Sequence, residues 1–369
     1  MNKTSKNYAS FDSRPLPKTF VLELTWRCNN ACLHCYNVWG TPELQYNQQD
    51  QREMSTEEIK DVIVRLQDDT DFKSLGLSGG EPFLRDDLSE ILSFVRSRGI
   101  GVVVITNGTL LTEERVAETM IGGTYEVTLL SHRKEVHDFM ADRHGAWEDV
   151  INGMANIRQT TGNLVVVFVA TKLNYMDLYK TAELAIALGA YGLMYNRINL
   201  SARNIKHADT LLPTPAMIQE NLDMLEEIGE KYNLSTAVSV VLEPCVIDIK
   251  KYKHIHFGWC PLAGEDSYFT IDPAGNVRIC NHSPTIVGNI KQQRFSHIYY
   301  HHPYVRKFHN TWPEDCEDCD PQKKKTCRGG CKAAAEQCYG TLSRVDPFVT
   351  LCKELGRDCS DSPGTESSN

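Results

Sequence analysis

The chain has 369 residues, with 39 Lys and Arg against 48 Asp and Glu and a formal net charge of −9. This acidic balance argues against nucleic acid as a partner, because a surface that binds the phosphate backbone is basic. No apolar run approaches the roughly 20 residues that cross a bilayer, and the N-terminus lacks the apolar region of a secretory signal. The sequence therefore predicts a soluble cytoplasmic protein with no membrane partner, large enough for one main domain and a smaller one.

Strands and helices alternate in the predicted pattern of the first 200 residues. Predicted strands occupy residues 19–25, 73–79, 101–108, 125–131, 163–172 and 191–201. Predicted helices lie at residues 54–67, 86–99, 112–121, 146–160 and 176–190. The first helix has Ser55 and Glu58 at the spacing of a capping box. The strands are continuous apolar runs, as expected when both faces of a parallel sheet are covered. This α/β pattern predicts parallel strands with helical crossovers.

The pattern changes after residue 200. A long helix is predicted at residues 214–233, and from Cys245 onward the segments are short, polar and interrupted by Cys, Gly and Pro. Residues 268–280 contain two short β runs around a turn, which predicts a β-hairpin. The final residues, SDSPGTESSN, are small and polar and predict a disordered tail.

Thirteen cysteines fall into two groups that flank a long cysteine-free body. Cys28, Cys32 and Cys35 form the first group, none lies between Cys35 and Cys245, and ten follow from Cys245 onward. Disulfides are disfavoured in the cytosol, where grouped cysteines more often bind metal. The grouping therefore predicts two metal-binding regions in two domains.

The first group has the spacing C-x3-C-x2-C at the carboxyl end of the first predicted strand, which is the sheet edge where ligands bind. Structural zinc usually has four protein ligands, and no fourth cysteine or well-spaced histidine completes this set, although His34 lies between two of the cysteines. Three thiolates leave one iron of a 4Fe–4S cluster free to bind a small molecule. A zinc site completed by a distant histidine and a set of inert buried cysteines are the alternatives.

The three cysteines followed by Tyr36, together with LSGGEP at residues 77–82, resemble the motifs of the radical S-adenosylmethionine (AdoMet) superfamily. This resemblance implies a partial (β/α)6 barrel and one 4Fe–4S cluster bound by Cys28, Cys32 and Cys35. In such enzymes the reduced cluster cleaves AdoMet to a 5′-deoxyadenosyl radical, which removes a hydrogen atom from the substrate. No catalytic residue is assigned beyond the cluster and AdoMet.

The resemblance also implies a set of residues that contact AdoMet. They are Tyr36, Gly79, Gly80, Glu81, Pro82, Asn107 and Thr128. The two glycines allow close approach of the backbone, and Glu81 is expected to accept hydrogen bonds from the methionyl ammonium. Thr128 is expected to contact the ribose. The chain departs from the family at Leu130 and Ser131, where Asp and Gly are common, so a strand threonine without a ligand is the alternative for Thr128.

The second cysteine group resembles the SPASM extension of these enzymes, which binds auxiliary iron–sulfur clusters. It begins with C-x14-G-x4-C and continues with CEDC, CRGGC and a later cysteine. The resemblance implies that an outer cluster is bound by Cys316, Cys319, Cys327 and Cys352. It implies that an inner cluster is bound by Cys260, Cys280 and Cys331, with either Cys245 or an open site as the fourth position. A zinc ribbon is the alternative that four of these cysteines alone would favour.

These matches divide the chain into four predicted parts. An N-terminal extension spans residues 1–18, the radical AdoMet barrel 19–235, the SPASM domain 236–358 and the disordered tail 359–369. The implied cofactors are AdoMet, one 4Fe–4S cluster that binds it, and two auxiliary iron–sulfur clusters of the same 4Fe–4S type.

SPASM proteins of this length commonly modify peptides, so the resemblance implies maturation of a ribosomally made precursor peptide by crosslinking, excision or oxidation. The expected partners are that peptide, a separate peptide-recognition protein of the RRE type, and a flavodoxin or ferredoxin as reductant. The alternatives are an enzyme acting on tetrapyrrole side chains, a formylglycine-forming enzyme of the sulfatase-maturase kind, and a non-catalytic electron carrier. Asn281 follows the hairpin cysteine where the formylglycine-forming group has an acidic residue, and the intact GGEP argues against a carrier.

Overall fold

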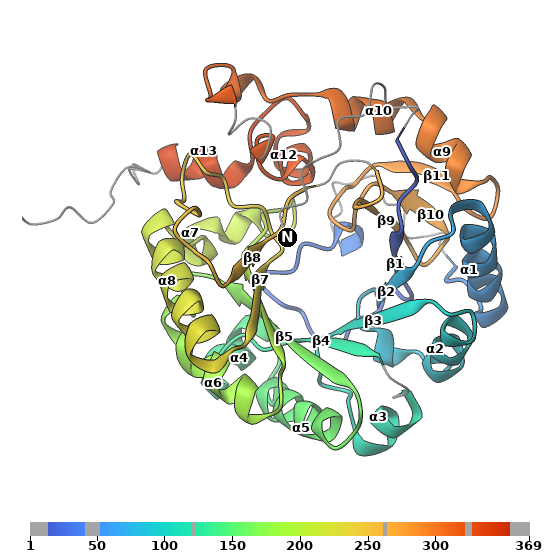
Figure 1. Ribbon diagram of the computed structural model, residues 1–369, viewed down its shortest axis with the longest axis horizontal. Coiled ribbons are helices and arrows are strands. Elements are labelled where there is room, and N and C mark those ends of the chain that lie inside the picture. The colour runs from blue at the N-terminus through green and yellow to red at the C-terminus, as the bar shows by residue number, and fades with distance from the viewer. Residues whose placement is uncertain (1–13, 41–51, 120–122, 261–263, 322–326, 355–369) are drawn as a thin grey trace, which may run out of the picture.

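The computed structural model describes residues 14–40, 52–119, 123–260, 264–321 and 327–354. These residues form one curved sheet of 11 strands in the order β11-β10-β9-β1-β2-β3-β4-β5-β6-β7-β8 (Figure 1). The strands are β1 Thr19–Glu23, β2 Ser74–Ser78, β3 Gly101–Thr106, β4 Thr124–Thr128, β5 Asn163–Ala170, β6 Gly192–Arg197, β7 Ser235–Val238, β8 Ile255–Phe257, β9 Tyr268–Ile271, β10 Asn276–Arg278 and β11 Ile286–Asn289.

The helices lie on the outside of the curved sheet, which encloses an inner space (Figure 1). They are α1 Thr56–Thr70, α2 Leu88–Ser97, α3 Glu113–Thr119, α4 Lys134–Ala141, α5 Ala146–Arg158, α6 Leu178–Ala187, α7 Ala208–Leu211, α8 Pro215–Tyr232, α9 Phe295–His301, α10 Pro303–Asn310, α12 Lys332–Tyr339 and α13 Pro347–Glu354. Strands β1 to β8 run parallel. The predicted α/β partial barrel is thus present, and β1 to β6 coincide with the six predicted strands.

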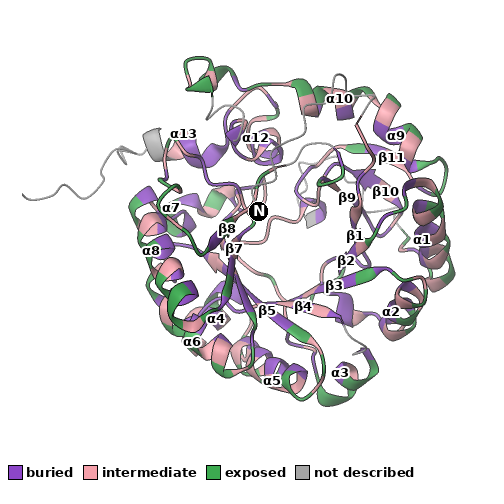
Figure 2. Cartoon of the chain, viewed as in Figure 1, coloured by how far each residue is buried: buried purple, intermediate pink, exposed green. Residues whose placement is uncertain are grey.

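The core forms between the outer face of the sheet and the inner faces of the helices, so the helices are buried on one side and exposed on the other (Figure 2). Helix α1 shows how the sequence produces this layer. Ser55 accepts a hydrogen bond from the Glu58 amide while Glu58 accepts one from the Ser55 amide, which is the predicted capping box. Ile59, Val62, Ile63 and Leu66 then lie on one face at helical spacing and are buried against the sheet.

The sheet continues beyond the six predicted strands. Two unpredicted strands, β7 and β8, extend it in parallel beyond β6. On the other side β9 pairs in parallel with β1, and β9 and β10 form the predicted hairpin around Asp272–Gly275. The second cysteine region is therefore built onto the first strand of the barrel, and the boundary predicted at residues 235 and 236 falls where β7 begins. The four-part division of the chain stays a prediction.

Further features of the described chain bear on the predictions made from the sequence. Helix α4 was not predicted, and it follows β4 at the point where the sequence departs from the family pattern. Among the described helices, none has the length and apolar character that crossing a membrane requires.

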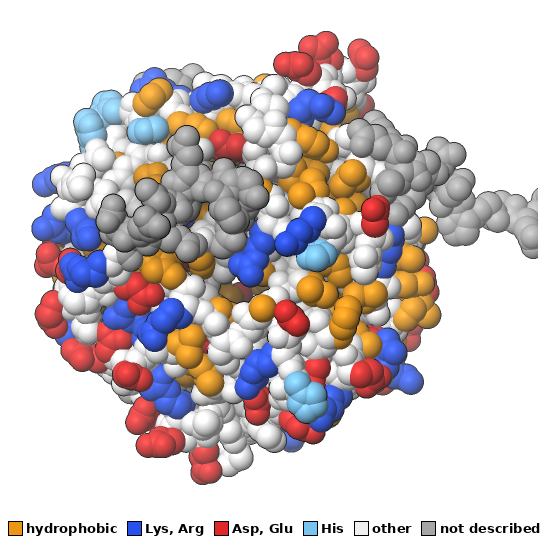
Figure 3. Space-filling model, turned by 180° about the vertical axis from the view of Figure 1, so that it is seen from behind, with side chains coloured by type: hydrophobic (Ala, Val, Ile, Leu, Met, Phe, Trp, Pro, Cys, Tyr) orange, Lys and Arg blue, Asp and Glu red, His pale blue; other side chains and the backbone are white. Residues whose placement is uncertain are grey.

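Acidic and basic side chains are interspersed around the rim of the face shown in Figure 3, while hydrophobic side chains concentrate on one side of it. Most of the predicted N-terminal extension and the whole predicted tail lie outside the described residues.

Candidate functional site

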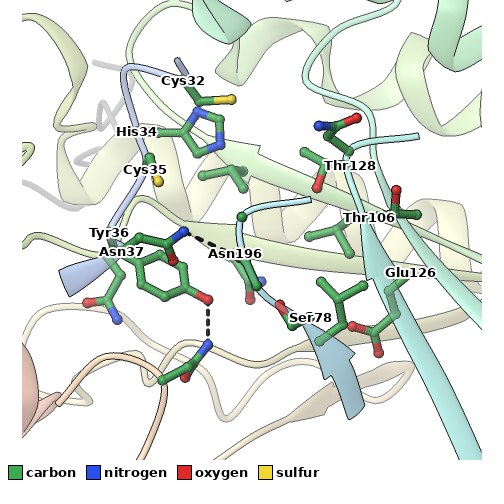
Figure 4. A pocket seen from close by; sticks show the side chains of 18 of the residues that line it. Cys32, His34, Cys35, Tyr36, Asn37, Ser78, Thr106, Glu126, Thr128 and Asn196 are labelled. Carbon is green, nitrogen blue, oxygen red and sulfur yellow. Dashed lines mark hydrogen bonds between the residues drawn. The ribbon is translucent and has the colours of Figure 1, made fainter. Parts of the chain in front are cut away.

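The inner face of the barrel strands and the loops that follow them surround a cavity of about 660 Å³ (Figure 4). Eight of the residues singled out from the sequence line it: Cys28, Cys32, Cys35, Tyr36, Gly79, Gly80, Asn107 and Thr128. The structure thus brings together residues from β1, β2, β3 and β4 that lie up to 100 positions apart. Glu81 and Pro82 do not line this cavity.

The three cysteines lie on one loop after β1, which α4 holds in place. The Ala31 amide donates to the Ala141 carbonyl (3.2 Å) and the Leu33 amide to the Met140 carbonyl (3.0 Å). Burial raises the pKa of the Cys28 and Cys32 thiols, and the charge of Cys35 raises both further. Three free thiols of one loop that face one cavity fit a cluster that takes three thiolates, since bound iron would keep them deprotonated.

The two glycines of the GGEP turn pack against the cysteine loop. The Gly80 amide donates to the Thr25 carbonyl (2.8 Å) and the Glu81 amide to the Arg27 carbonyl (2.8 Å). A Cβ atom on Gly80 would lie 2.1 Å from the Arg27 carbonyl oxygen, and Gly79 has a φ of +141°. The glycines are therefore needed to join the two loops, in addition to the approach to a ligand that the motif predicted.

Glu81 is fully buried behind the cavity wall. Its carboxylate accepts hydrogen bonds from the Thr106 hydroxyl (2.8 Å), the Asn107 amide (2.8 Å) and the Phe83 amide (3.1 Å). Burial raises the pKa of Glu81 to about 7, and these three donors oppose the shift. In the structure this residue ties the loop after β2 to the loop after β3, and the predicted contact with an ammonium group stays a prediction.

A chain of hydrogen bonds crosses the cavity wall beside the first cysteine loop. The Asn281 side-chain amide donates to the Tyr36 hydroxyl (2.5 Å), and the Tyr268 hydroxyl donates to the Asn281 amide oxygen (3.0 Å). Burial raises the pKa of both tyrosines. Tyr268 was not predicted from the sequence, although it begins the predicted hairpin that ends at Cys280.

The inner cysteines lie on the other side of that chain of hydrogen bonds. Cys260, Cys280 and Cys331 line a second cavity of about 180 Å³, and Tyr36, Tyr268 and Asn281 line both cavities. Burial, with the charge of Cys260, raises the pKa of Cys280 to about 12. The structure thus gathers the three thiols predicted for the inner cluster, next to the cavity of the first cysteine group.

Cys245 does not lie with the inner cysteines. It lines a small cavity of about 20 Å³ together with Cys316, Cys319 and Cys327, three of the four cysteines predicted for the outer cluster. Burial raises the pKa of Cys245 to about 11, and the charges of Cys319 and Cys316 add to the shift. Cys245 and an open site were the two alternatives for the fourth position of the inner set, and that assignment stays a prediction. In the structure the chain after β7 brings Cys245 beside three of the outer cysteines, which favours the open site. The side chain of Cys352 lies outside the described residues.

No group of three or more His, Cys, Asp or Glu side chains in the described ranges is close enough to hold a single metal ion. In an iron–sulfur cluster each thiolate binds a different iron, so the ligands are spread more widely. The assignment of individual cysteines as ligands stays a prediction.

A buried ion-pair cluster joins the barrel to the second cysteine region. Arg197, at the end of β6, pairs with Glu243 (2.9 Å) and Asp346 (2.8 Å), and all three side chains are fully buried. Asp346 also accepts a hydrogen bond from the Cys331 amide (3.0 Å). This cluster was not predicted, because its members are more than 40 residues apart and carry no common motif.

Two family models match the chain. Residues 22–185 match the radical SAM superfamily, and residues 260–320 match SPASM, an iron–sulfur cluster-binding domain. The protein is a radical SAM enzyme with a C-terminal SPASM domain. This confirms the predicted fold class and the predicted cofactors, which are AdoMet, a 4Fe–4S cluster and auxiliary iron–sulfur clusters.

The chain is similar to two characterised enzymes over most of its length. It is 27% identical over 355 residues to the AdoMet-dependent heme synthase of Methanosarcina barkeri, covering 90% of this chain and 96% of the relative. It is 28% identical over 337 residues to the mycofactocin maturase MftC of Mycolicibacterium smegmatis, covering 86% of this chain and 79% of the relative.

Solved structures share the fold at lower sequence identity. SuiB of Streptococcus suis, bound to the precursor peptide SuiA, superposes with a TM-score of 0.71 at 14% identity, over 90% of this chain and 75% of that chain. The enzyme anSMEcpe with bound AdoMet and a peptide superposes with a TM-score of 0.65 at 16% identity, over 92% and 96% of the two chains.

Proposed function

We propose that this enzyme matures a ribosomally made precursor peptide by abstracting a hydrogen atom from one of its residues. The observation that carries the proposal is the pair of adjoining cavities, one lined by Cys28, Cys32 and Cys35 and the other by the inner cysteines. A peptide side chain that enters the larger cavity is held close to both thiol sets. Similarity to a mycofactocin maturase supports a peptide as substrate.

The residues of the chain would bind the cofactors as the motifs predict. Cys28, Cys32 and Cys35 would hold the cluster, and Gly79, Gly80, Asn107, Thr128 and Tyr36 would surround AdoMet in the same cavity. Bound together, the cluster and AdoMet supply one-electron cleavage and hydrogen abstraction. The apolar inner residues of β1, β3 and β5 exclude water, which protects reactive species from side reactions.

An enzyme acting on a tetrapyrrole is the second candidate. The specific observation in its favour is the similarity to a heme synthase, which extends over 96% of that relative.

A formylglycine-forming activity has less support, because Asn281 forms hydrogen bonds with two tyrosines at the position where that reaction would use a carboxylate as base. With a peptide as substrate, we expect two protein partners: a separate peptide-recognition protein, and a flavodoxin or ferredoxin that supplies electrons.

The test uses enzyme whose iron is reconstituted without oxygen. The reduced enzyme is given AdoMet and, separately, the peptides encoded by short reading frames beside its gene or a tetrapyrrole with intact side chains. We expect 5′-deoxyadenosine and a mass change in a peptide. A mass change in the tetrapyrrole alone would overturn the peptide proposal.

Two variants locate the chemistry within the enzyme. Cys35→Ala should abolish AdoMet cleavage, because the first cluster loses a ligand, whereas Cys316→Ala should retain part of the cleavage and lose the product. Cys338→Ala is the matched control, since this free thiol lines none of the three cavities. Unchanged product from Cys316→Ala would show that the outer cysteines are not required.

A further inference from the structure

Glu126 places a carboxylate on the inner wall of the large cavity. It lies in the middle of β4, two residues before Thr128, and alternation along the strand turns residues 124, 126 and 128 to the same face. In the sheet its neighbours are Ile105 on β3 and Val165 on β5. Figure 4 shows Glu126 directed into the cavity, deeper than Thr128 and on the side of Ser78.

The wall around this carboxylate is largely apolar. Val21, Val103, Ile105, Val167 and Met194 line the same cavity. Among the described residues that line it, Glu126 is the one acidic side chain. The three cysteines that line the cavity lie instead in the loop beyond the end of β1.

Glu126 is partly buried, and it differs from two fully buried acids of the barrel in having no partner among the described residues. Glu23 pairs with Arg278, and Glu81 accepts three hydrogen bonds. The Glu126 carboxylate has no hydrogen bond or ion pair with any residue of the described chain. Burial raises the pKa of Glu126, and no donor opposes that shift.

An unpaired carboxylate in an apolar wall is unfavourable for folding, because its charge loses hydration and gains no hydrogen bond in return. Such a residue is therefore expected to have a partner when the protein works. A cation is the partner that stabilises the charged form most, through a charge-assisted hydrogen bond at low dielectric.

We propose that Glu126 forms a subsite that binds a positively charged group of the substrate, such as an ammonium or guanidinium side chain. The subsite would hold the substrate by its cationic end deep in the barrel, so that the carbon atoms nearer the strand ends face the AdoMet region. The inference rests on the proposed function in that it names a chemical feature of the substrate peptide. It predicts that this peptide carries Lys, Arg or a free amine near the residue that is modified.

The test measures binding of two probes of the same shape and different charge. n-Butylguanidinium and its neutral analogue n-butylurea are titrated into the reconstituted holoenzyme by isothermal titration calorimetry. The wild type should bind the cation about tenfold more tightly or better, as expected for a charged hydrogen bond in a buried site. Glu126→Gln should remove this preference, and Glu126→Asp should keep part of it.

The control variant is Glu114→Gln, which makes the same change of charge at an exposed position on α3. It should bind both probes as the wild type does. Equal affinity of the wild type for the two probes would overturn the proposal, whatever the variants do, and so would a preference that survives Glu126→Gln. Probe binding does not depend on AdoMet cleavage, so failure of this subsite and failure of the proposed reaction are seen in different assays.

Discussion

Single residues decide how the barrel and the cysteine-rich region are held together. Arg197 pairs with two buried carboxylates from distant segments, Glu243 and Asp346, and its guanidinium lies 4.5 Å from the centre of the Phe348 ring. A buried ion pair of this kind costs solvation energy to form, but removal of one partner leaves the others charged and unpaired.

Arg197→Met should therefore lower the free energy of unfolding by about 3–5 kcal/mol. Arg65→Met is the matched control, because Arg65 is exposed and makes two surface contacts, an ion pair with Asp61 (3.5 Å) and a hydrogen bond to the Lys291 carbonyl (3.4 Å). The control should cost less than about 1 kcal/mol. Denaturant unfolding measures both, and similar losses in the two variants would contradict the role given to Arg197.

His137 illustrates a residue whose charge state is fixed by burial. It is buried on α4, and its ring Nδ1 accepts a hydrogen bond from the Leu130 amide (3.2 Å). Burial lowers the pKa of His137 from 6.5 to about 4, so the folded protein keeps this ring neutral. This hydrogen bond closes the turn between β4 and α4.

The pKa of His137 predicts a pH dependence with a definite sign. Because the folded-state pKa is lowered, the contribution to stability is complete above pH 6.5 and is lost as the pH falls toward 4. The stability advantage of the wild type over His137→Gln should shrink by about 3 kcal/mol across that range. Unfolding is measured for both in the same cluster state, and an advantage that is constant with pH would show that His137 is not the group that titrates.

At the scale of elements, two loops from different strands must fit together before a cofactor can bind. The loop after β1 carries the first cysteines, and the loop after β2 carries Gly79 and Gly80. Their backbones are joined by hydrogen bonds from the Gly80 and Glu81 amides, and the space between them leaves no room for a side chain at Gly80.

Gly80→Ala should displace the cysteine loop, since its Cβ would lie 2.1 Å from the Arg27 carbonyl oxygen. Such overpacking is expected to weaken AdoMet binding about tenfold or more. It should also lower the iron content of the first cluster. Gly101→Ala is the control, because a Cβ there meets its nearest atom at an ordinary 3.4 Å. Full iron and normal AdoMet affinity in Gly80→Ala would contradict the close fit of the two loops.

At the scale of the whole molecule, three thiol sets are arranged around one continuous sheet. The first follows β1, the inner set lies beside β9 and β10, and the outer set is reached by the turn after β7 and the segments before α12. Because β9 pairs with β1, the hairpin that carries Cys280 is fixed directly beside the strand that carries the first cysteines.

This arrangement predicts how the auxiliary clusters respond to loss of Cys245. Three clusters of four irons correspond to about 12 irons per chain, and Cys245→Ala should alter the same electron paramagnetic resonance signal as Cys319→Ala. Cys280→Ala should alter a different signal. A Cys245→Ala spectrum that matches Cys280→Ala would return Cys245 to the inner set.

Local patterns in the sequence predicted the six barrel strands and most of the helices between them, but not β7, β8 or α4. Continuous apolar strands, helical spacing and the Ser55–Glu58 cap depend on neighbouring residues, so they could be recognised locally, and β1 to β6 formed where they were expected. The three cysteines and the glycine turn carry a pattern that is specific at short range. In the structure these residues line one cavity, and their roles as ligands stay predictions.

Contacts between residues far apart in the sequence depend on how the chain folds in three dimensions. Glu81, which is predicted to contact AdoMet, accepts hydrogen bonds from residues of the next loop. Cys245, one of two alternatives for the inner set, lines a cavity with three of the outer cysteines. No sequence pattern pointed to Arg197 or Glu126. Arg197 stands out because its ion-pair partners lie more than 40 residues away in the sequence. Glu126 stands out because its carboxylate has no partner among the described residues. Burial and pairing depend on how the sheet curves and closes, and no local pattern of residues encodes that.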